Sequence, residues 1–324
     1  MKQVAFLTIL LFLVTALNAQ ISVNIKGQII NTNNSKLLFI RNDEGLIPIK
    51  SISDGTFILD LKCYHLPSFI TLNGVSKRGK IIQYFPKIWF ASDSVKIIFD
   101  FENKSFQTHD RTNFQDLSEK IEALGKKKRL KFLIENFNKI PSLYFIEYEK
   151  HNFALNDLRR IYQGVQSQYG NLIYVQRLGG YIEAKSKPRV KIGSKVEDFK
   201  LPNKSGDYQS VLTNTSKQKL IAILSSGCQY SIASIPLLEQ FYKISKEQNK
   251  NIELITIWSD ESYQSDSTDK IIWLDLLDEY GFASTYFNRN MWPAFYVISN
   301  EHVLIDKFSG YGKKTAKRLE RLLQ

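Results

Sequence analysis

Cys228 is the residue whose surroundings point most directly to chemistry. It follows an apolar run that ends at Leu224 and precedes a helical stretch that contains Pro236. A cysteine at the first turn of a helix is favoured as the thiolate, because the helix N-terminus presents unpaired N–H groups and the positive end of its dipole. A dithiol site would have its second cysteine three residues later, where this chain has Ser231. The sequence therefore predicts a thiol–disulfide exchange site with one of its two thiols missing.

The missing thiol limits what this site can do. A dithiol protein attacks a substrate disulfide with one thiolate and resolves the mixed disulfide with the other. Cys228 alone could form mixed disulfides and pass them to a small thiol or a partner, in isomerisation, deglutathionylation-type exchange or substrate trapping. It could not carry out an autonomous two-electron reduction. The hydroxyl of Ser231 could donate a hydrogen bond to the thiolate in place of the lost S–H.

The pattern of apolar residues divides the rest of the chain into a leader and three stretches. Residues 20–107 alternate apolar and polar positions around the turn Asp54-Gly55, which predicts a small antiparallel β domain of the sandwich type. Residues 108–187 have helical spacing and predict a helical connector. Residues 188–324 alternate β-branched runs with helical stretches and predict a mixed α/β domain. There we expect strands over 220–225, 252–258, 294–299 and 303–308, and helices over 229–248, 271–280 and 313–323.

The first nineteen residues have the pattern of a cleavable signal peptide. Lys2 gives a positive start, residues 4–17 are an apolar segment too short to span a bilayer, and Ala19 is a small residue before the expected cleavage at Gln20. No later segment approaches the ~18 consecutive apolar residues of a membrane helix. We therefore expect an exported protein, periplasmic or secreted, without stable membrane insertion.

Composition argues against several other function classes. The net charge is +12, but the positive residues are scattered apart from 126–129, a solvated helical face, and we expect no nucleic-acid partner. Cys63 and Cys228 are the two cysteines, and Cys63 is expected to fill space in a strand. We expect no metal and no cofactor, because no phosphate-binding glycine loop is present and the histidines lack metal-ligand spacing. These histidines are His65, His109, His151 and His302.

Four segments between Ile192 and Gln324 carry a resemblance to known proteins. They are residues 193–201, the stretch Cys228 to Ser231 with Pro236 at helix-proline spacing, Trp273, and Met291-Trp292-Pro293-Ala294-Phe295. Together they resemble the thioredoxin-like superfamily, in particular the periplasmic TlpA-type thiol-disulfide oxidoreductases. The resemblance implies an α/β thioredoxin fold for residues 188–324. It also implies that Trp273 lies in the helix after the second strand.

The resemblance also implies roles for individual residues. Cys228 and Ser231 occupy the catalytic positions. The segment around Pro293 resembles the cis-proline loop that faces the active cysteine and binds substrate backbone, so Trp292 and Pro293 are expected to bind substrate. Gln229 and Tyr230, between the two catalytic positions, are expected to do so as well. The implied partners are protein or small-molecule thiols and disulfides.

Three departures from that group surround the cysteine. Gly227 replaces the usual tryptophan, Ser231 the second cysteine, and Ser234 the frequent helix glutamate. The sequence thus predicts an oxidoreductase or isomerase with a degenerate, single-thiol site. One alternative is a catalytically inactive interaction or scaffold protein of the cell envelope. Another is a peroxide-reducing cysteine, because Ser225 precedes Cys228 by three residues, although Ile221 stands where that motif has proline.

The region before the α/β domain carries a second resemblance. A β domain followed by helices containing Phe137-Asn138-Lys139-Ile140-Pro141-Ser142 resembles the multidomain thioredoxin-like proteins of Bacteroidetes. No activity of that group's β domain can be transferred. The β domain is therefore only a candidate surface for an envelope protein partner.

Overall fold

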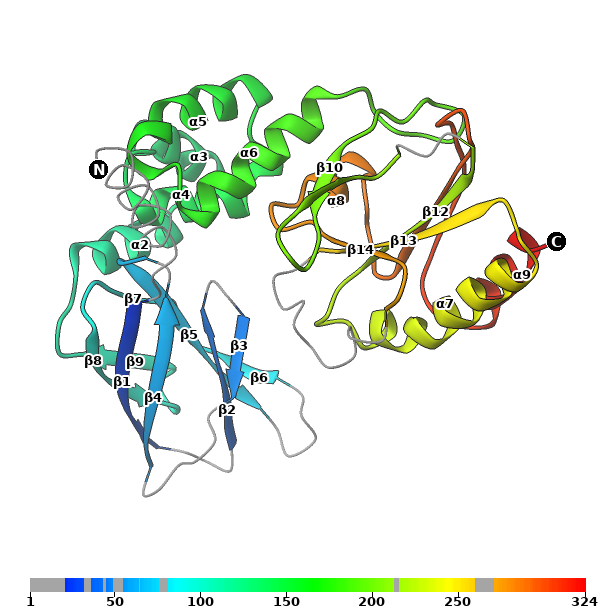
Figure 1. Ribbon diagram of the computed structural model, residues 1–324. Helices are drawn as coiled ribbons and strands as arrows, with labels where there is room; N and C mark the ends of the chain where they lie inside the picture. The colour runs from blue at the N-terminus through cyan, green and yellow to red at the C-terminus, as the bar shows by residue number, and fades with distance from the viewer. Residues whose placement is uncertain are drawn as a thin grey trace, which may run out of the picture. The chain divides into compact units, whose positions relative to one another are not determined.

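The computed structural model describes residues 21–31, 36–42, 45–48, 55–63, 65–75, 81–212, 216–259 and 271–324, and the expected signal peptide lies outside them (Figure 1). The chain forms two compact units, Met1–Tyr148 and Glu149–Gln324. The division falls inside the stretch predicted as a helical connector. Three of the helices of that stretch belong to the first unit and two to the second.

The first sheet of the first unit has the strand order β4-β1-β8-β9. Strands β1 and β8 run parallel, whereas β4 and β9 pair antiparallel to their neighbours, so the prediction of a purely antiparallel domain is wrong at one pair. The long connection between β1 and β8 allows this, because the chain can return to the same end of the sheet before β8 begins. The bounds are β1 Ile21–Ile30, β4 Thr56–Cys63, β8 Ser94–Asp100 and β9 Ser105–Thr108.

A second sheet packs against the first through a shared core. Its order is β3-β2-β5-β6, with β7 paired to β5. Ile70 and Ile88 of this sheet and Val23 and Val95 of the other belong to one buried cluster, which makes the domain sandwich-like. The bounds are β2 Lys36–Asn42, β3 Gly45–Pro48, β5 Ser68–Val75, β6 Ile81–Tyr84 and β7 Ile88–Phe90.

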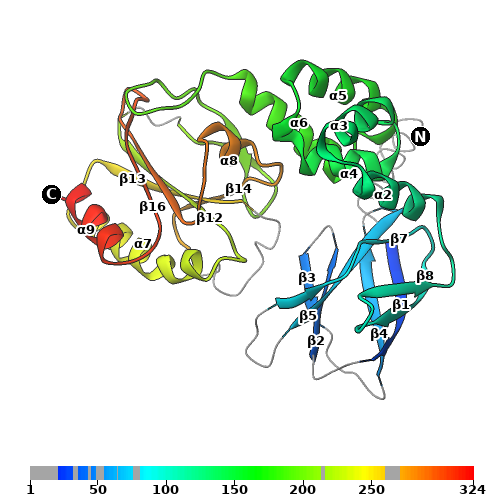
Figure 2. The same cartoon turned by 180° about the vertical axis from the view of Figure 1, so that it is seen from behind.

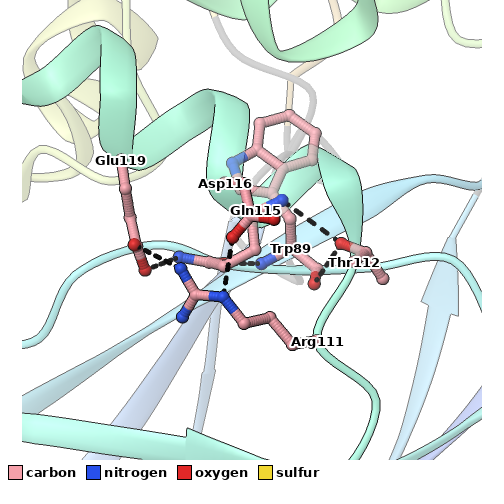
Figure 3. A network of polar contacts seen from close by, with 6 residues as sticks. All are labelled: Trp89, Arg111, Thr112, Gln115, Asp116 and Glu119. Atoms are coloured by element: carbon pink, nitrogen blue, oxygen red, sulfur yellow. Dashed lines mark hydrogen bonds and ion pairs between the residues drawn. The ribbon is translucent and has the colours of Figure 1, made fainter.

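Buried Gln115 joins helix α2 to strand β7 (Figure 3). Its Oε1 accepts the N–H of Trp89 at 2.8 Å, and its Nε2 donates to Glu119 Oε1 at 2.9 Å. Thr112 caps the helix by accepting the N–H of Gln115 at 3.2 Å. Arg111 adds ion pairs to Asp116 and Glu119 on the exposed side. The helices are α2 Asn113–Ala123, α3 Lys126–Glu135 and α4 Ile140–Tyr148.

The second unit begins with helices that pack closely on one another and on the region that follows. Gly179 and Gly180 of α6 permit this, since an added Cβ would lie 2.9 Å from the ring of Tyr162 and 2.7 Å from the carbonyl oxygen of Tyr280 respectively. The elements before the main sheet are the 3-10 turn η2 Lys150–Asn152, α5 Leu155–Tyr169, α6 Ile173–Ser186, and the hairpin strands β10 Lys200–Pro202 and β11 Tyr208–Ser210.

The main sheet of the second unit has the order β14-β13-β12-β15-β16. Strands β12, β13 and β14 are parallel, and β15 and β16 are antiparallel to their neighbours. This order and these directions, with a helix between β12 and β13, are those of a thioredoxin-like α/β fold, as the sequence predicts. The strands are β12 Gln218–Leu224, β13 Ile252–Trp258, β14 Leu274–Leu277, β15 Ala294–Ile298 and β16 Leu304–Ser309.

Both faces of this sheet are buried. Leu220, Ala222 and Leu224 of β12 face the cluster that includes the long helix and the last helix, whereas Ile221 and Ile223 face the opposite cluster. This alternation follows from the two-residue period of a strand and explains the continuous apolar run. The long helix and the last helix lie side by side in both views (Figures 1 and 2). The helices are α7 Gln229–Glu247, α8 Phe282–Tyr286 and α9 Lys313–Leu322.

The helix predicted over residues 271–280 is wrong. Residues 274–277 form the edge strand β14, and Trp273 stands just before it instead of inside a helix. The apolar spacing here fits either period, and pairing with β13 decides in favour of a strand. Leu276 then faces one cluster and Leu277 the other. Trp273 Nε1 donates to Thr256 Oγ1 at 2.8 Å, which fixes the indole beside β13.

Replacing Gln115 should destabilise the first unit measurably. Gln115→Ala leaves the N–H of Trp89 in a buried place without its acceptor, so we expect a loss of about 1–3 kcal/mol in the free energy of unfolding. Urea unfolding of the full chain measures this. Arg111→Ala, which removes only exposed ion pairs, should lose about 0–1 kcal/mol. An equal loss in both variants would contradict the role of Gln115.

Buried Asp278 should make the stability of the second unit depend on pH. Its two carboxylate oxygens accept the N–H groups of Ala283 and Ser284 at 2.9 and 2.8 Å, yet burial raises its pKa. A raised pKa means that the folded state binds the proton more tightly than the unfolded state does. Protonated Asp278 therefore contributes to the free energy of unfolding below the unfolded pKa of about 3.9, and this contribution is lost as pH rises through the pKa of the folded state.

We therefore expect the wild type to lose stability relative to Asp278→Asn as pH rises from about 4. The measurement is the difference between the two urea midpoints at a series of pH values. A difference that stays constant with pH would contradict the effect of burial.

Candidate functional site

The structure places Cys228 at the N-cap position of α7, four residues beyond the end of β12. Its N–H donates to the carbonyl oxygen of Ser225 at 3.2 Å, and its own carbonyl oxygen accepts the N–H groups of Ser231 and Ile232 at 2.9 and 3.1 Å. The residue is half-buried. The thiol therefore lies at the N-terminal end of α7.

The predicted proline loop lies directly against this thiol. The Trp292–Pro293 peptide bond is cis, and the carbonyl oxygen of Trp292 lies 3.9 Å from Cys228 Sγ. Pro293 precedes β15, whose antiparallel pairing with β12 brings its first residue to the end of β12. The N–H of Gly310 donates to the carbonyl oxygen of Pro293 at 2.8 Å and holds the loop from the other side.

Ser231 lies in the first turn of α7, inside the protein. It is fully buried, and its Oγ accepts the N–H of Ser225 at 3.2 Å. Ser234, also buried, donates its hydroxyl to the carbonyl oxygen of Ser231 at 2.7 Å. Ser231 and Ser234 thus connect the end of β12 to the first turn of α7. Their contacts stabilise the backbone that carries Cys228.

Tyr230 and Gln229 are exposed at the start of α7. The Tyr230 ring stacks on that of Tyr311, with ring centroids 6.4 Å apart and an angle of 27° between the planes. Tyr311 lies between β16 and α9 and was not a predicted site residue. Its flanking residues Gly310 and Gly312 both have positive φ, 87° and 135°, a conformation that glycine adopts without strain. The two glycines on either side of Tyr311 were the feature of the sequence that could have indicated a loop with positive φ angles here.

Two further residues missed by the sequence analysis hold Trp292. Its Nε1 donates to Ser259 Oγ at 2.6 Å, and the guanidinium carbon of Arg289 lies 3.7 Å from the centroid of its ring. Ser259 in turn donates its hydroxyl to the carbonyl oxygen of Leu224 at 2.9 Å. Ser259 could have been suspected, since it directly follows a strand predicted to be parallel to the one before Cys228. Nothing in the sequence singles out Arg289.

The charge on Arg289 is retained despite its surroundings. Burial lowers the pKa of its guanidinium, but an arginine starts from a value far above neutral. A cation stacked on an indole is attracted by the electron-rich ring face. Trp292, although partly exposed, is therefore fixed on its ring face and at its N–H. This fixes the carbonyl oxygen that it presents to Cys228.

The other predicted residues lie apart from this site. Cys63 is buried in the core of the first unit, which confirms its packing role, and neither cysteine forms a disulfide in the described structure. Among the residues described, no group of three acidic, histidine or cysteine side chains could hold a metal ion. In the same part of the chain, no helix is both long and apolar enough to cross a membrane.

Comparison with known proteins gives matches only among solved structures. No family model and no curated protein matches the chain. A Chlorobium tepidum structure described as a thiol:disulfide interchange protein, DsbE, is 17% identical over 41% of this chain and 96% of its own, with a TM-score of 0.37.

The thioredoxin domain of a Bacteroides vulgatus thiol-disulfide oxidoreductase is 16% identical over 42% of this chain and 99% of its own, with a TM-score of 0.36. StoA from Bacillus subtilis is 16% identical over 40% of this chain and 100% of its own, with a TM-score of 0.34. The thioredoxin-like fold rests instead on the strand order and directions given above.

The two cysteines should differ in their reaction with an alkylating reagent. In the native protein we expect iodoacetamide to modify Cys228 and to leave Cys63, whose exposed fraction is 2%, unmodified. Mass spectrometry should find one modified thiol in the native chain and two after denaturation. Cys228→Ala should show none in the native state. Fast native labelling of Cys63 would contradict the described core.

Proposed function

We propose that the chain exchanges thiols and disulfides through Cys228 alone, by way of mixed disulfides. One observation carries the proposal: Cys228 occupies the N-cap position of α7, and its half-buried thiol lies 3.9 Å from the carbonyl oxygen that precedes cis Pro293. The proline loop offers a backbone edge beside the sulfur, and a thiolate is the nucleophile in such exchange. A substrate peptide could therefore lie along the loop with its sulfur at Cys228.

The exchange proceeds in two displacements. The Cys228 thiolate attacks one sulfur of a substrate disulfide, so that a new S–S bond forms and the other substrate sulfur leaves as a thiolate. A second thiolate, from a small thiol or a protein, then attacks the mixed disulfide. This thiolate attacks the substrate sulfur and forms a new disulfide with it. The bond between the substrate sulfur and Cys228 breaks, and Cys228 leaves again as the thiolate. The chain itself is neither oxidised nor reduced over the cycle.

The surrounding residues support this chemistry in different ways. Trp292 and Pro293 bind the substrate backbone, and exposed Gln229 and Tyr230 line the approach to the thiol. Ser231 acts from below as a positioning residue, because its hydroxyl holds the peptide N–H of Ser225. The substrates are proteins or small molecules that contain thiols or disulfides.

The proposed place of action is the periplasm or the cell exterior. The signal-peptide pattern of the first nineteen residues supports export, and disulfide exchange is useful in such oxidising compartments. The N-terminal β domain would then be available to an envelope protein partner.

A second candidate is an interaction protein of the cell envelope with no exchange activity. The observation in its favour is that Ser231 and Ser234 are buried and bind backbone groups, so the positions of the lost cysteine and glutamate now have packing roles. In that case the same surface would bind a partner without a covalent step.

Reaction with Ellman's reagent, an aromatic disulfide, tests the proposal. In the wild type, Cys228 should release one equivalent of thionitrobenzoate, faster than glutathione does, and keep the other as a mixed disulfide that added glutathione removes. Ser231→Cys should release a second equivalent, because the introduced thiol resolves the adduct within the chain. Ser231→Ala is the matched control and should release one.

The same measurements can also favour the interaction protein. A Cys228 that reacts more slowly than glutathione, together with no protein trapped on it in the cell envelope, would contradict exchange and favour the interaction protein. Cys228→Ala supplies the background for both measurements.

A further inference from the structure

A basic groove lies in the second unit where the last strand meets the last helix. It has a volume of about 510 Å³ and is formed by β16 and α9. Four of the residues that line it carry a positive charge, and Phe308 and Thr315 contribute the rest of the wall with Ser309. The four cations are Lys314, Lys317, Arg318 and Arg321.

Helical spacing brings these cations together. They occur at intervals of three, one and three residues, and therefore line one stripe of α9 about 10 Å long. Leu319 and Leu323, on another face, are buried in the core and fix which side of the helix meets solvent. In the sequence these residues are interrupted by apolar and polar ones, so the stripe is less apparent than the run at 126–129.

Most of this charge is not neutralised by the protein. Arg318 lies 3.5 Å from Asp306, whereas Lys314, Lys317 and Arg321 have no carboxylate within ion-pair distance among the residues described. The guanidinium carbon of Arg318 also lies 5.1 Å from the centroid of the Phe308 ring. That ring stacks in turn on buried Phe295, so one side of the guanidinium rests on a fixed surface.

The start of α9 lacks both an acidic side chain and a capping side chain. Its first turn has no acidic residue, and its N-cap is Gly312, which has no side chain to cap the helix. Lys313 and Lys314 instead add positive charge at the positive end of the helix dipole. Positive side chains in the first turn of a helix interact unfavourably with its dipole. The helix thus has an unfavourable feature that a bound anion would remove.

We propose that this groove binds a compact molecule with two or more phosphate groups. One phosphate cannot reach cations spread over about 10 Å, whereas two or three linked phosphates can, and their negative charge can balance that of Lys314, Lys317 and Arg321. The planar fork of Arg318 suits phosphate oxygens. The volume of about 510 Å³ is suited to an oligophosphate and is small for a folded partner. The phosphates belong to a soluble molecule or to lipid headgroups.

Calorimetric titration of the full chain with inorganic tripolyphosphate tests the proposal. At low salt we expect binding at one site that weakens as salt is added. The triple variant Lys314→Gln, Lys317→Gln, Arg321→Gln should weaken binding at least tenfold. The control Lys126→Gln, Lys127→Gln, Lys128→Gln removes the same charge from the exposed start of α3 and should change it less than twofold. A cooperative urea transition in each variant verifies folding.

Vesicles distinguish the two sources of phosphate. The site is assigned to lipid headgroups if the protein sediments with phosphatidylglycerol vesicles but not with phosphatidylcholine vesicles. Tripolyphosphate should then compete with this sedimentation, and the triple variant should not sediment. Tripolyphosphate binding without sedimentation assigns it to a soluble ligand. The proposal is overturned if tripolyphosphate does not bind, if both triple variants lose affinity equally, or if hexaglutamate binds as tightly.

Discussion

The pairing of β12 with a parallel strand on one edge and an antiparallel strand on the other determines the geometry of the second unit. On the antiparallel side, Ile223 pairs with Ala294, so the end of β12 meets the beginning of β15. Cys228 follows the end of β12, and Pro293 directly precedes the beginning of β15. The contact of 3.9 Å between Sγ and the carbonyl oxygen of Trp292 therefore follows from strand register. Because both faces of β12 are buried, a register shift of one residue would move each of its side chains into the opposite core cluster.

Hydroxyl groups complete the polar contacts where β12 ends. Ser259 donates both its N–H and its hydroxyl to the carbonyl oxygen of Leu224, each at 2.9 Å. Ser231 accepts the next N–H of the chain, that of Ser225. The last groups of a central strand would otherwise be buried without partners, which is costly. The serine that occupies the second thiol position thus has a structural task that does not depend on redox chemistry.

Local patterns in the sequence predicted much of this structure. Alternation and helical spacing located β12, α7 and the strands around Pro293, and the helix-start position of Cys228 follows from them. Pairing between distant segments was not accessible in the same way. The parallel pair of β1 and β8 and the edge strand β14 depend on partners far away in the sequence, and residues 271–280 fit both periods. Arg289 was missed because only the fold brings it onto Trp292.

The distribution of tryptophan has a consequence for spectroscopy. Of the four tryptophans in the chain, Trp89, Trp258 and Trp273 are buried, and Trp292 has an exposed fraction of 38%. A buried indole emits at shorter wavelength than one in contact with water, so the long-wavelength edge of the emission spectrum belongs to a single residue. That residue contributes its carbonyl oxygen to the contact with Cys228. The protein therefore carries an intrinsic optical probe at the cysteine, readable without a label.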